Sequence, residues 1–176
     1  MKLSKSQLQK VISLLVLLAF LLVSLLAPPD LPPPSPTPIG TTIDKSLVKA
    51  QVMRVIDGDT IELNTGEKVR YIGIDAPEVN SRDTKISCYA NEATARNRSL
   101  VENKEITMQK DVSETDRYGR LLRYVYVDNL FVNHALVADG FARAKDYPPD
   151  SKYKSLLANT ETEAKVIKQG LWGKCQ

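Results

Sequence analysis

Apolar residues in this chain follow two patterns, first one unbroken run and then short periods typical of strands and helices. The run covers 11–27, reads VISLLVLLAFLLVSLLA and has no polar face, so it predicts a hydrophobic helix near the N-terminus. A proline-rich segment, 28–43, follows, and its prolines favour an extended, semi-rigid spacer. The periodic part fills 44–176, which predicts one globular domain of ordinary size.

Within this domain, alternation of polar and apolar residues predicts three strands in meander order. A helix, two further strands and two more helices follow, and the last two helices end at Gly140 and Gly170. Five short strands with a helix between the third and the fourth are typical of a Greek-key barrel of the oligonucleotide-binding type. We therefore predict an α+β, mainly β fold: a five-stranded OB-fold barrel with three α-helices, preceded by the hydrophobic helix. The predicted strands are 46–56, 60–63, 67–74, 105–112 and 121–127, and the predicted helices are 89–102, 131–139 and 153–169.

Helical periodicity also predicts which side of each helix faces the core. The inward residues expected in the first helix are Ala90, Ala93, Asn97, Leu100 and Val101. Those expected in the last helix are Tyr153, Leu156, Leu157, Thr160, Ala164 and Ile167.

The N-terminal run indicates where the protein resides. A helix of this length measures about 25 Å, within the range of membrane spans, and lysines precede it. We interpret 1–10 as a basic cytoplasmic flank and 11–27 as a signal anchor, which places the domain outside the cytoplasm. The alternative is secretion after signal-peptide cleavage, for which Ala27 suits the cut but Leu25 does not.

The formal net charge of +3 is unevenly distributed. Before Asp44, three lysines face one aspartate, which leaves +2 in the tail and +1 in the domain. A protein that coats duplex DNA normally has a strongly basic face, so the near-neutral domain disfavours that class. Two cysteines and one histidine also leave too few ligands for a typical zinc site, and any metal is expected to be held by oxygen.

Carboxylates gather in two turns that bracket the second and third predicted strands. Asp57 and Asp59 belong to IDGDT, and Asp75 and Glu78 belong to IDAPE. The glycine and the proline of these motifs predict rigid turns, so the acids are expected at strand ends. Such acids, brought together, form an oxygen-lined site for a hard divalent cation.

Two arginines extend this pattern toward phosphate chemistry. Arg70 lies in the third predicted strand, and Arg120 ends the loop DRYGR. A cation with two guanidinium groups beside it can offset charge that develops on phosphate oxygens, and a free carboxylate can activate water. The alternative is that both arginines only form surface salt bridges with these acids.

Five ordered motifs now identify a family resemblance. IDGDT, RYIGIDAPE, DRYGR, VNHALVADGFA and the closing GLW resemble the staphylococcal (thermo)nuclease family, over about residues 46–173. Five motifs in order at compatible spacing are far more specific than any one of them. The resemblance implies a calcium-dependent phosphodiesterase of DNA and RNA, in which water attacks phosphorus and leaves 3′-phosphate and 5′-hydroxyl ends.

The resemblance also implies roles for the acids. Asp59 and Asp75 would hold Ca²⁺, together with the backbone carbonyl of Ala76, which stands where the family has threonine. Asp57 would be an outer acid near the metal. Glu78 corresponds to the carboxylate assigned as general base for water, a role also described as simple positioning.

The remaining roles concern the phosphate and the base. Arg70 and Arg120 correspond to the two phosphate-clamping arginines. Tyr118 and Tyr147 fall where family tyrosines approach the nucleotide, and packing alone is the alternative for each. Lys145 stands near where the family often has a second tyrosine, so part of the base platform differs here.

The substrate expected from this pattern is a single strand or a breathing region of DNA or RNA, bound by a monomer. An alternative from another class is a catalytically silent OB-fold module that binds single-stranded nucleic acid or a protein partner at the cell surface. A third is a surface module that receives calcium or DNA without cutting it. Retention of both the acids and the arginines favours the enzyme over the silent barrel.

The two cysteines, Cys88 and Cys175, lie before the first predicted helix and after the last. If the domain lies outside the cytoplasm, we expect them to form a disulfide. Two free thiols are the alternative.

Overall fold

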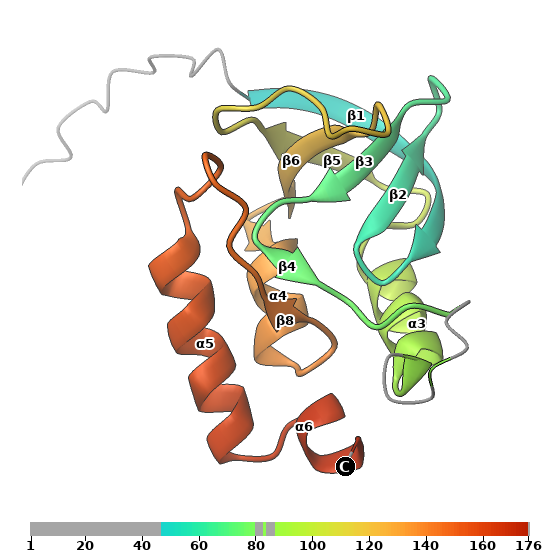
Figure 1. Cartoon of the computed structure of the whole chain (residues 1–176). Coiled ribbons are helices and arrows are strands. Elements are labelled where there is room, and N and C mark those ends of the chain that lie inside the picture. The colour runs from blue at the N-terminus through green and yellow to red at the C-terminus, as the bar shows by residue number, and fades with distance from the viewer. Residues whose placement is uncertain (1–46, 80–82, 84–86, 176) are drawn as a thin grey trace, which may run out of the picture. The chain divides into compact units, whose positions relative to one another are not determined.

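The computed structural model describes residues 47–79, 83 and 87–175, coloured in Figure 1. The predicted flank 1–10, anchor 11–27 and spacer 28–43 lie outside the described residues. Among the helices that are described, none has the length and apolar character needed to cross a membrane.

Five strands form a closed barrel in the upper part of Figure 1. Neighbouring strands pair in the order β3-β2-β1-β5-β6, and β3 also pairs with β6, which closes the barrel. That closing pair is parallel, with Val69 opposite Leu121, whereas the other four pairs are antiparallel. The predicted five-stranded barrel is confirmed. The strands are β1 (Leu47–Asp57), β2 (Thr60–Leu63), β3 (Lys68–Tyr71), β5 (Glu105–Gln109) and β6 (Leu121–Val127).

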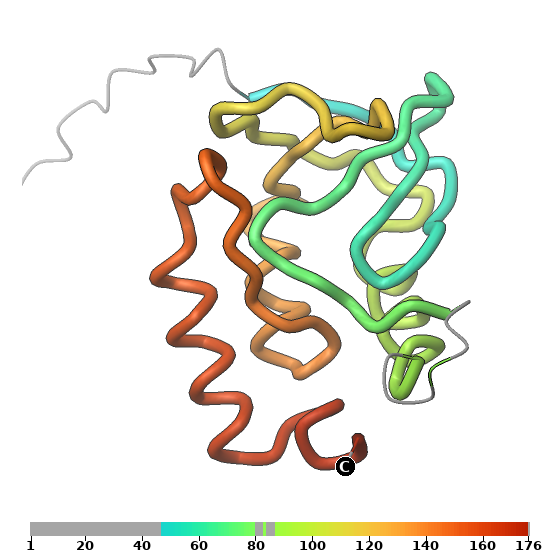
Figure 2. The backbone as a smooth tube through the Cα atoms, in the orientation of Figure 1, coloured from blue at the N-terminus to red at the C-terminus, as the bar shows by residue number. Residues whose placement is uncertain are grey.

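Strand β1 pairs along its length with two different partners. Residues 47–51 pair with β5, and the stretch from Val52 to Asp57 pairs with β2. The register with β2 shifts twice, which is typical of bulges that bend a strand. At the end of this bent strand, the Asp57 carbonyl accepts a hydrogen bond of 3.0 Å from the side chain of Asn97. Figure 2 shows the same course of the chain as a tube.

The helices and three short strands complete the domain. In Figure 1, α5 runs beside α4, and α6 turns back below it. Strand β4 pairs with β8, and β7 pairs with β6. The three predicted helices are present, and the one-turn α6 and the short strands β7 and β8 were not predicted. The bounds are β4 (Ile74–Asp75), β7 (Leu130–Phe131), β8 (Arg143–Ala144), α3 (Ala90–Val101), α4 (Val132–Ala138), α5 (Lys154–Val166) and α6 (Leu171–Lys174).

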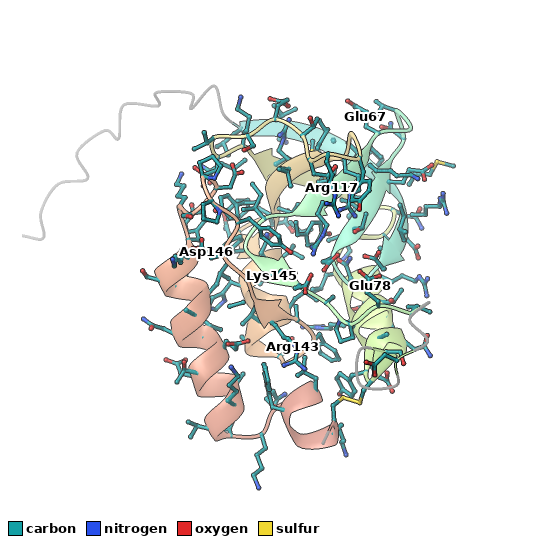
Figure 3. All side chains as sticks on the ribbon, in the orientation of Figure 1. Glu67, Glu78, Arg117, Arg143, Lys145 and Asp146 are labelled. Atoms are coloured by element: carbon teal, nitrogen blue, oxygen red, sulfur yellow. A yellow bond between two sulfur atoms is a disulfide. The ribbon has the colours of Figure 1, made fainter. Side chains whose placement is uncertain are left out.

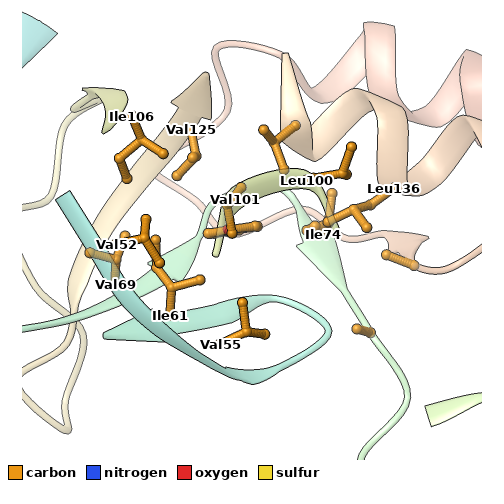
Figure 4. Packing of buried hydrophobic residues seen from close by; sticks show 14 of the residues in the cluster. Val52, Val55, Ile61, Val69, Ile74, Leu100, Val101, Ile106, Val125 and Leu136 are labelled. Atoms are coloured by element: carbon orange, nitrogen blue, oxygen red, sulfur yellow. The ribbon is translucent and has the colours of Figure 1, made fainter. Parts of the chain in front are cut away.

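The hydrophobic core fills the barrel and continues between the barrel and the helices (Figure 4). Val52, Ile61, Val69 and Val125 are fully buried within it. The inward face predicted for α3 is confirmed, since all five of its expected residues are buried. One of them is the polar Asn97, whose partners belong to the site described below.

Two of the predicted strands are too long. The stretch 67–74 breaks at 72–73, because Gly73 has φ of 80° and a Cβ there would lie 2.6 Å from Leu157 Cδ1. Strand β5 ends at Gln109 rather than at Val112, whose backbone N–H instead binds the Asp150 carboxylate.

The prediction for the last helix is wrong in its C-terminal end and in two of the residues expected to face the core. Helix α5 ends at Val166, three residues before the expected end. Leu156 is 44% exposed and Ile167 is 69% exposed, although both were expected to face the core. The buried residues Leu157, Thr160 and Ala164 define a narrower inward stripe, and Leu156 lies about 100° away from Leu157 around the helix.

A disulfide joins Cys88, just before α3, to Cys175, just after α6. Its yellow bond is visible in Figure 3 between these two helices. The two cysteines are 87 residues apart in the sequence, so the bond closes a loop that contains most of the domain.

Candidate active site

The turn between β1 and β2 places the first two acids against β4 and α3. A Cβ at Gly58 would lie 2.5 Å from the Ala76 Cβ and 2.9 Å from the Ala93 Cβ, so only glycine permits this approach. Within the turn, the backbone N–H of Asp59 donates to Asp57 Oδ1 at 3.1 Å. The tight turn expected from the sequence is present, with Asp57 opposite Thr60, and glycine is needed in it for close packing.

Arg70 joins the acids of the two motifs. Its Nη1 lies 2.8 Å from Asp59 Oδ2, and its Nη2 lies 2.9 Å from Asp75 Oδ1. Asp59 Oδ2 also accepts a hydrogen bond of 2.6 Å from the backbone N–H of Ala76. The Tyr147 hydroxyl accepts from Arg70 Nη2 and donates to Asp75 Oδ1, both at 3.3 Å. The side chains of Arg70 and Asp59 are 10% and 7% exposed, so this is a buried cluster and not a surface salt bridge.

Burial is the largest single influence on the pKa of Asp59 and on that of Arg70. It raises the pKa of Asp59, and the nearby Asp57 adds to the rise, while the Arg70 guanidinium and the Ala76 N–H oppose it. Burial also disfavours the charged form of Arg70, but the neighbouring Asp59, Tyr147 and Asp75 together raise its pKa. The guanidinium therefore stays charged and holds the two carboxylates beside each other.

A pocket of about 500 Å³ opens over this cluster. Its charged lining is balanced, with four Lys and Arg side chains and four Asp and Glu side chains. In Figure 3, Glu78, Arg117 and Lys145 lie around it on the face toward the viewer. Asp57, Asp59 and Ala76 are not part of its lining. The predicted site residues that line it are Arg70, Asp75, Glu78, Tyr118, Arg120 and Tyr147.

The loop DRYGR forms one wall of the pocket and is organised by Asp116. Asp116 Oδ1 accepts from the backbone N–H of Tyr118 at 2.9 Å and of Arg120 at 3.0 Å. Asp116 Oδ2 accepts from Arg120 Nε at 2.6 Å, and these bonds lower the pKa of Asp116 against the effect of its burial. Arg120 thus pairs with its own loop and not with the acids around Arg70. Tyr118 is 68% exposed, and the guanidinium carbons of Arg117 and Arg120 lie 4.7 and 5.5 Å from the centre of its ring.

Glu78 differs from the other acids of the two motifs. It is exposed at the pocket, and it has no ion pair or hydrogen bond with other residues in the described part of the chain. A carboxylate of this kind is available to bind water or a substrate group.

Two further residues hold the site in place, and reasoning from the sequence missed their role. Asn97 Nδ2 donates to the Asp57 carbonyl, and its Oδ1 accepts from the Tyr71 hydroxyl, both at 3.0 Å. The Asp150 carboxylate accepts from the backbone N–H groups of Val112 and Ser113, at 2.9 and 2.7 Å. A polar side chain on an otherwise apolar helix face was the available signal for Asn97. No comparable signal marked Asp150.

The residues expected to hold calcium fit a hard cation by the chemistry of their donor atoms. Asp59 and Asp75 contact one guanidinium, and the Asp59–Ala76 hydrogen bond brings the segment with the Ala76 carbonyl alongside. Oxygen donors of this kind suit Ca²⁺, which accepts carboxylates, carbonyls and water. Within the described ranges, no group of three or more acidic, His or Cys side chains could hold a metal.

Comparison with known proteins decides the family. The family described as "Staphylococcal nuclease homologue" matches residues 68–174. The chain belongs to the staphylococcal nuclease family. It is 36% identical to the thermonuclease of Staphylococcus hyicus over 125 residues, which cover 69% of this chain and 74% of that protein.

Two relatives from Bacillus subtilis (strain 168) are named as endonucleases. Endonuclease YncB is 39% identical over 135 residues, and the SPbeta prophage-derived endonuclease YokF is 38% identical over 135 residues. Each match covers 74% of this chain, but only 64% of YncB and 46% of YokF. As a member of this nuclease family, the chain is a hydrolase of phosphodiester bonds.

Proposed function

We propose that this nuclease is a calcium-dependent phosphodiesterase of DNA and RNA, which leaves 3′-phosphate and 5′-hydroxyl ends. The observation that carries the proposal is the gathering of six expected residues around one pocket, with Arg70 between two carboxylates at its base. The balanced charge of the pocket supports a metal requirement, because a bound dication would tip the balance toward a phosphate.

Each side chain at the pocket has a task that its surroundings permit. Glu78 has no competing partner in the described part of the chain, so its carboxylate can orient water and accept its proton. Arg70 and Arg120 would place their positive charges beside the phosphate oxygens and offset charge that develops there. Calcium held by Asp59, Asp75 and the Ala76 carbonyl would supply Lewis-acid stabilisation of the same oxygens.

The two tyrosines support a preference for unpaired strands. Tyr118 presents an exposed ring beside Arg120, and Tyr147 contacts Arg70 and Asp75. A pocket of about 500 Å³ suits one nucleotide, so a base must leave its helix before it can stack on Tyr118. All of these groups come from one chain, which supports action as a monomer.

We also propose that 11–27 anchors the protein and that the nuclease domain, 44–176, acts outside the cytoplasm. The Cys88–Cys175 disulfide supports that compartment, because such bonds persist mainly in oxidising environments. Mass spectrometry of the purified native protein would test the anchor. A mature N-terminus near residue 28 would instead support secretion after cleavage.

The test of the proposed chemistry compares the purified full chain with its Glu78→Gln variant on denatured DNA, in calcium or in EDTA. We expect rapid degradation only by the unchanged protein in calcium, and a loss of about 10²- to 10⁴-fold in Glu78→Gln. Phosphatase treatment before end-labelling by polynucleotide kinase should be unnecessary, because the 5′ ends are hydroxyls.

Glu67→Gln is the matched control, since Glu67 is exposed in the β2–β3 turn and does not line the pocket. It should retain full activity. Equal degradation in all tubes would defeat the mechanism, and binding of single strands without cutting would support the silent module instead.

A further inference from the structure

Asp75 has a cation on each of its two carboxylate oxygens. Its Oδ1 faces Arg70 Nη2 at 2.9 Å, and its Oδ2 faces Lys145 Nζ at 3.0 Å. Asp75 is also one of the two carboxylates assigned above to calcium. A metal that binds Asp75 must therefore compete with a positive charge that the chain itself supplies.

The two cations differ in how firmly they are held. Arg70 is buried and also pairs with Asp59, so its position is fixed by two carboxylates. The Lys145 side chain is 48% exposed, and its ammonium pairs with Asp75 alone among acids of the described chain. Its backbone N–H is bound to the Gly73 carbonyl at 2.9 Å, so the flexible four-carbon stem can swing while the chain stays in place.

Electrostatics favours movement of Lys145 when a dication arrives. The ammonium, the dication and the Arg70 guanidinium would then crowd around Asp59 and Asp75, and like charges within a few ångströms repel strongly. Lys145 also lines the pocket, with Nζ 5.2 Å from the centre of the Tyr147 ring. A released ammonium therefore has a place beside the proposed nucleotide site.

We propose that Lys145 is a displaceable counter-ion of Asp75, which weakens metal binding in the free protein and binds a substrate phosphate once the metal has displaced it. The inference rests on the proposed calcium-dependent function. Metal and nucleic acid then bind with positive coupling through Lys145, and each strengthens the other by the same factor.

The test is a calcium titration by calorimetry on the full chain without nucleic acid. Lys145→Met should bind Ca²⁺ about two- to fivefold more tightly than the unchanged protein, the range expected for loss of a partly exposed ion pair. Lys145→Arg, which keeps the charge, should restore the weaker affinity. Lys49→Met removes an equal charge from a lysine paired with Glu105 outside the pocket, so it should change the affinity much less.

A second titration includes a phosphorothioate oligothymidylate of five nucleotides, which resists cleavage. The unchanged protein should then gain calcium affinity, and the gain should be smaller in Lys145→Met. Equal calcium affinities of the unchanged protein and Lys145→Met, with matching urea unfolding curves, would overturn the inference and leave the proposed function intact. Absence of both calcium binding and calcium-dependent cutting in the unchanged protein would overturn the two together.

Discussion

The candidate site has a barrel side, made of Asp59, Arg70 and Asp75, and a loop side, made of Glu78, Tyr118 and Arg120. The barrel side is mostly buried, and one guanidinium pairs with both of its carboxylates. The loop side is more exposed, and Arg120 pairs within its own loop. In the proposed function, the buried barrel side would hold the metal, whereas the more exposed loop side would contact the substrate.

Removal of the disulfide should have the largest effect on stability while leaving the barrel side intact. Cys88→Ser combined with Cys175→Ser should lower the free energy of unfolding by about 4 to 5 kcal/mol, because the bond closes a loop of 87 residues. Urea denaturation measures the loss. Calcium affinity of the folded variant should be unchanged, and a changed affinity would show that the barrel side depends on the disulfide.

Substitution of one arginine on each side tests whether the two sides contribute differently to stability. Arg70→Met should lower the free energy of unfolding by about 3 to 5 kcal/mol, because it leaves the buried Asp59 without its cation. Arg120→Met should cost about 1 kcal/mol or less, since backbone N–H groups still bind Asp116. Both should lose nuclease activity in assays at matched folded fraction. Equal unfolding free energies of the two variants would contradict the difference in stability between the two sides.

A smaller effect is expected from the helix that supports the barrel side. Asn97→Leu should cost about 1 to 3 kcal/mol of unfolding free energy, because the Tyr71 hydroxyl and the Asp57 carbonyl lose their partner. Tyr71→Phe added to it should recover part of the loss. Thermal and urea unfolding would measure both, with Asn91→Leu, an exposed position of α3, as the control. A loss of equal size at Asn91 would argue against a specific role for Asn97.

The smallest effect on stability is expected at Tyr118, in the loop DRYGR. Tyr118→Ala should change the free energy of unfolding by about 0.5 kcal/mol or less, because the ring is 68% exposed. It should weaken binding of a single-stranded substrate by about 1 to 3 kcal/mol, the usual contribution of one stacked base. KM for denatured DNA would report the change, and an unaltered KM would remove Tyr118 from the nucleotide site.

The sequence predicted those parts of the fold that local patterns determine. Strands β2 and β6 have the predicted bounds, and the buried face of α3 has the predicted residues. The break at Gly73 and the early end of β5 depend on contacts with Leu157 and Asp150, which lie far away in the chain. Local alternation does not contain such information.

The same limit applies to the site. The acids and arginines could be selected from the sequence motifs because these residues lie at or near strand ends and in a short loop. The motifs did not reveal that Arg70 pairs with both Asp59 and Asp75. They also did not reveal that Lys145, which directly follows β8, pairs with Asp75. These pairings follow from barrel closure and from the β4–β8 pair, which are tertiary features.

The disulfide also divides the chain into a covalent ring and an open arm. The ring, 88–175, contains Tyr118, Arg120, Lys145 and Tyr147, and the arm before it contains Asp59, Arg70, Asp75 and Glu78. A protease cut inside the ring leaves one covalent molecule. A cut after Arg82 or Lys85 instead yields two chains that each carry half of the site. Cleavage there would turn a single-chain enzyme into a two-component one, whose activity depends on concentration and on strand pairing between the pieces.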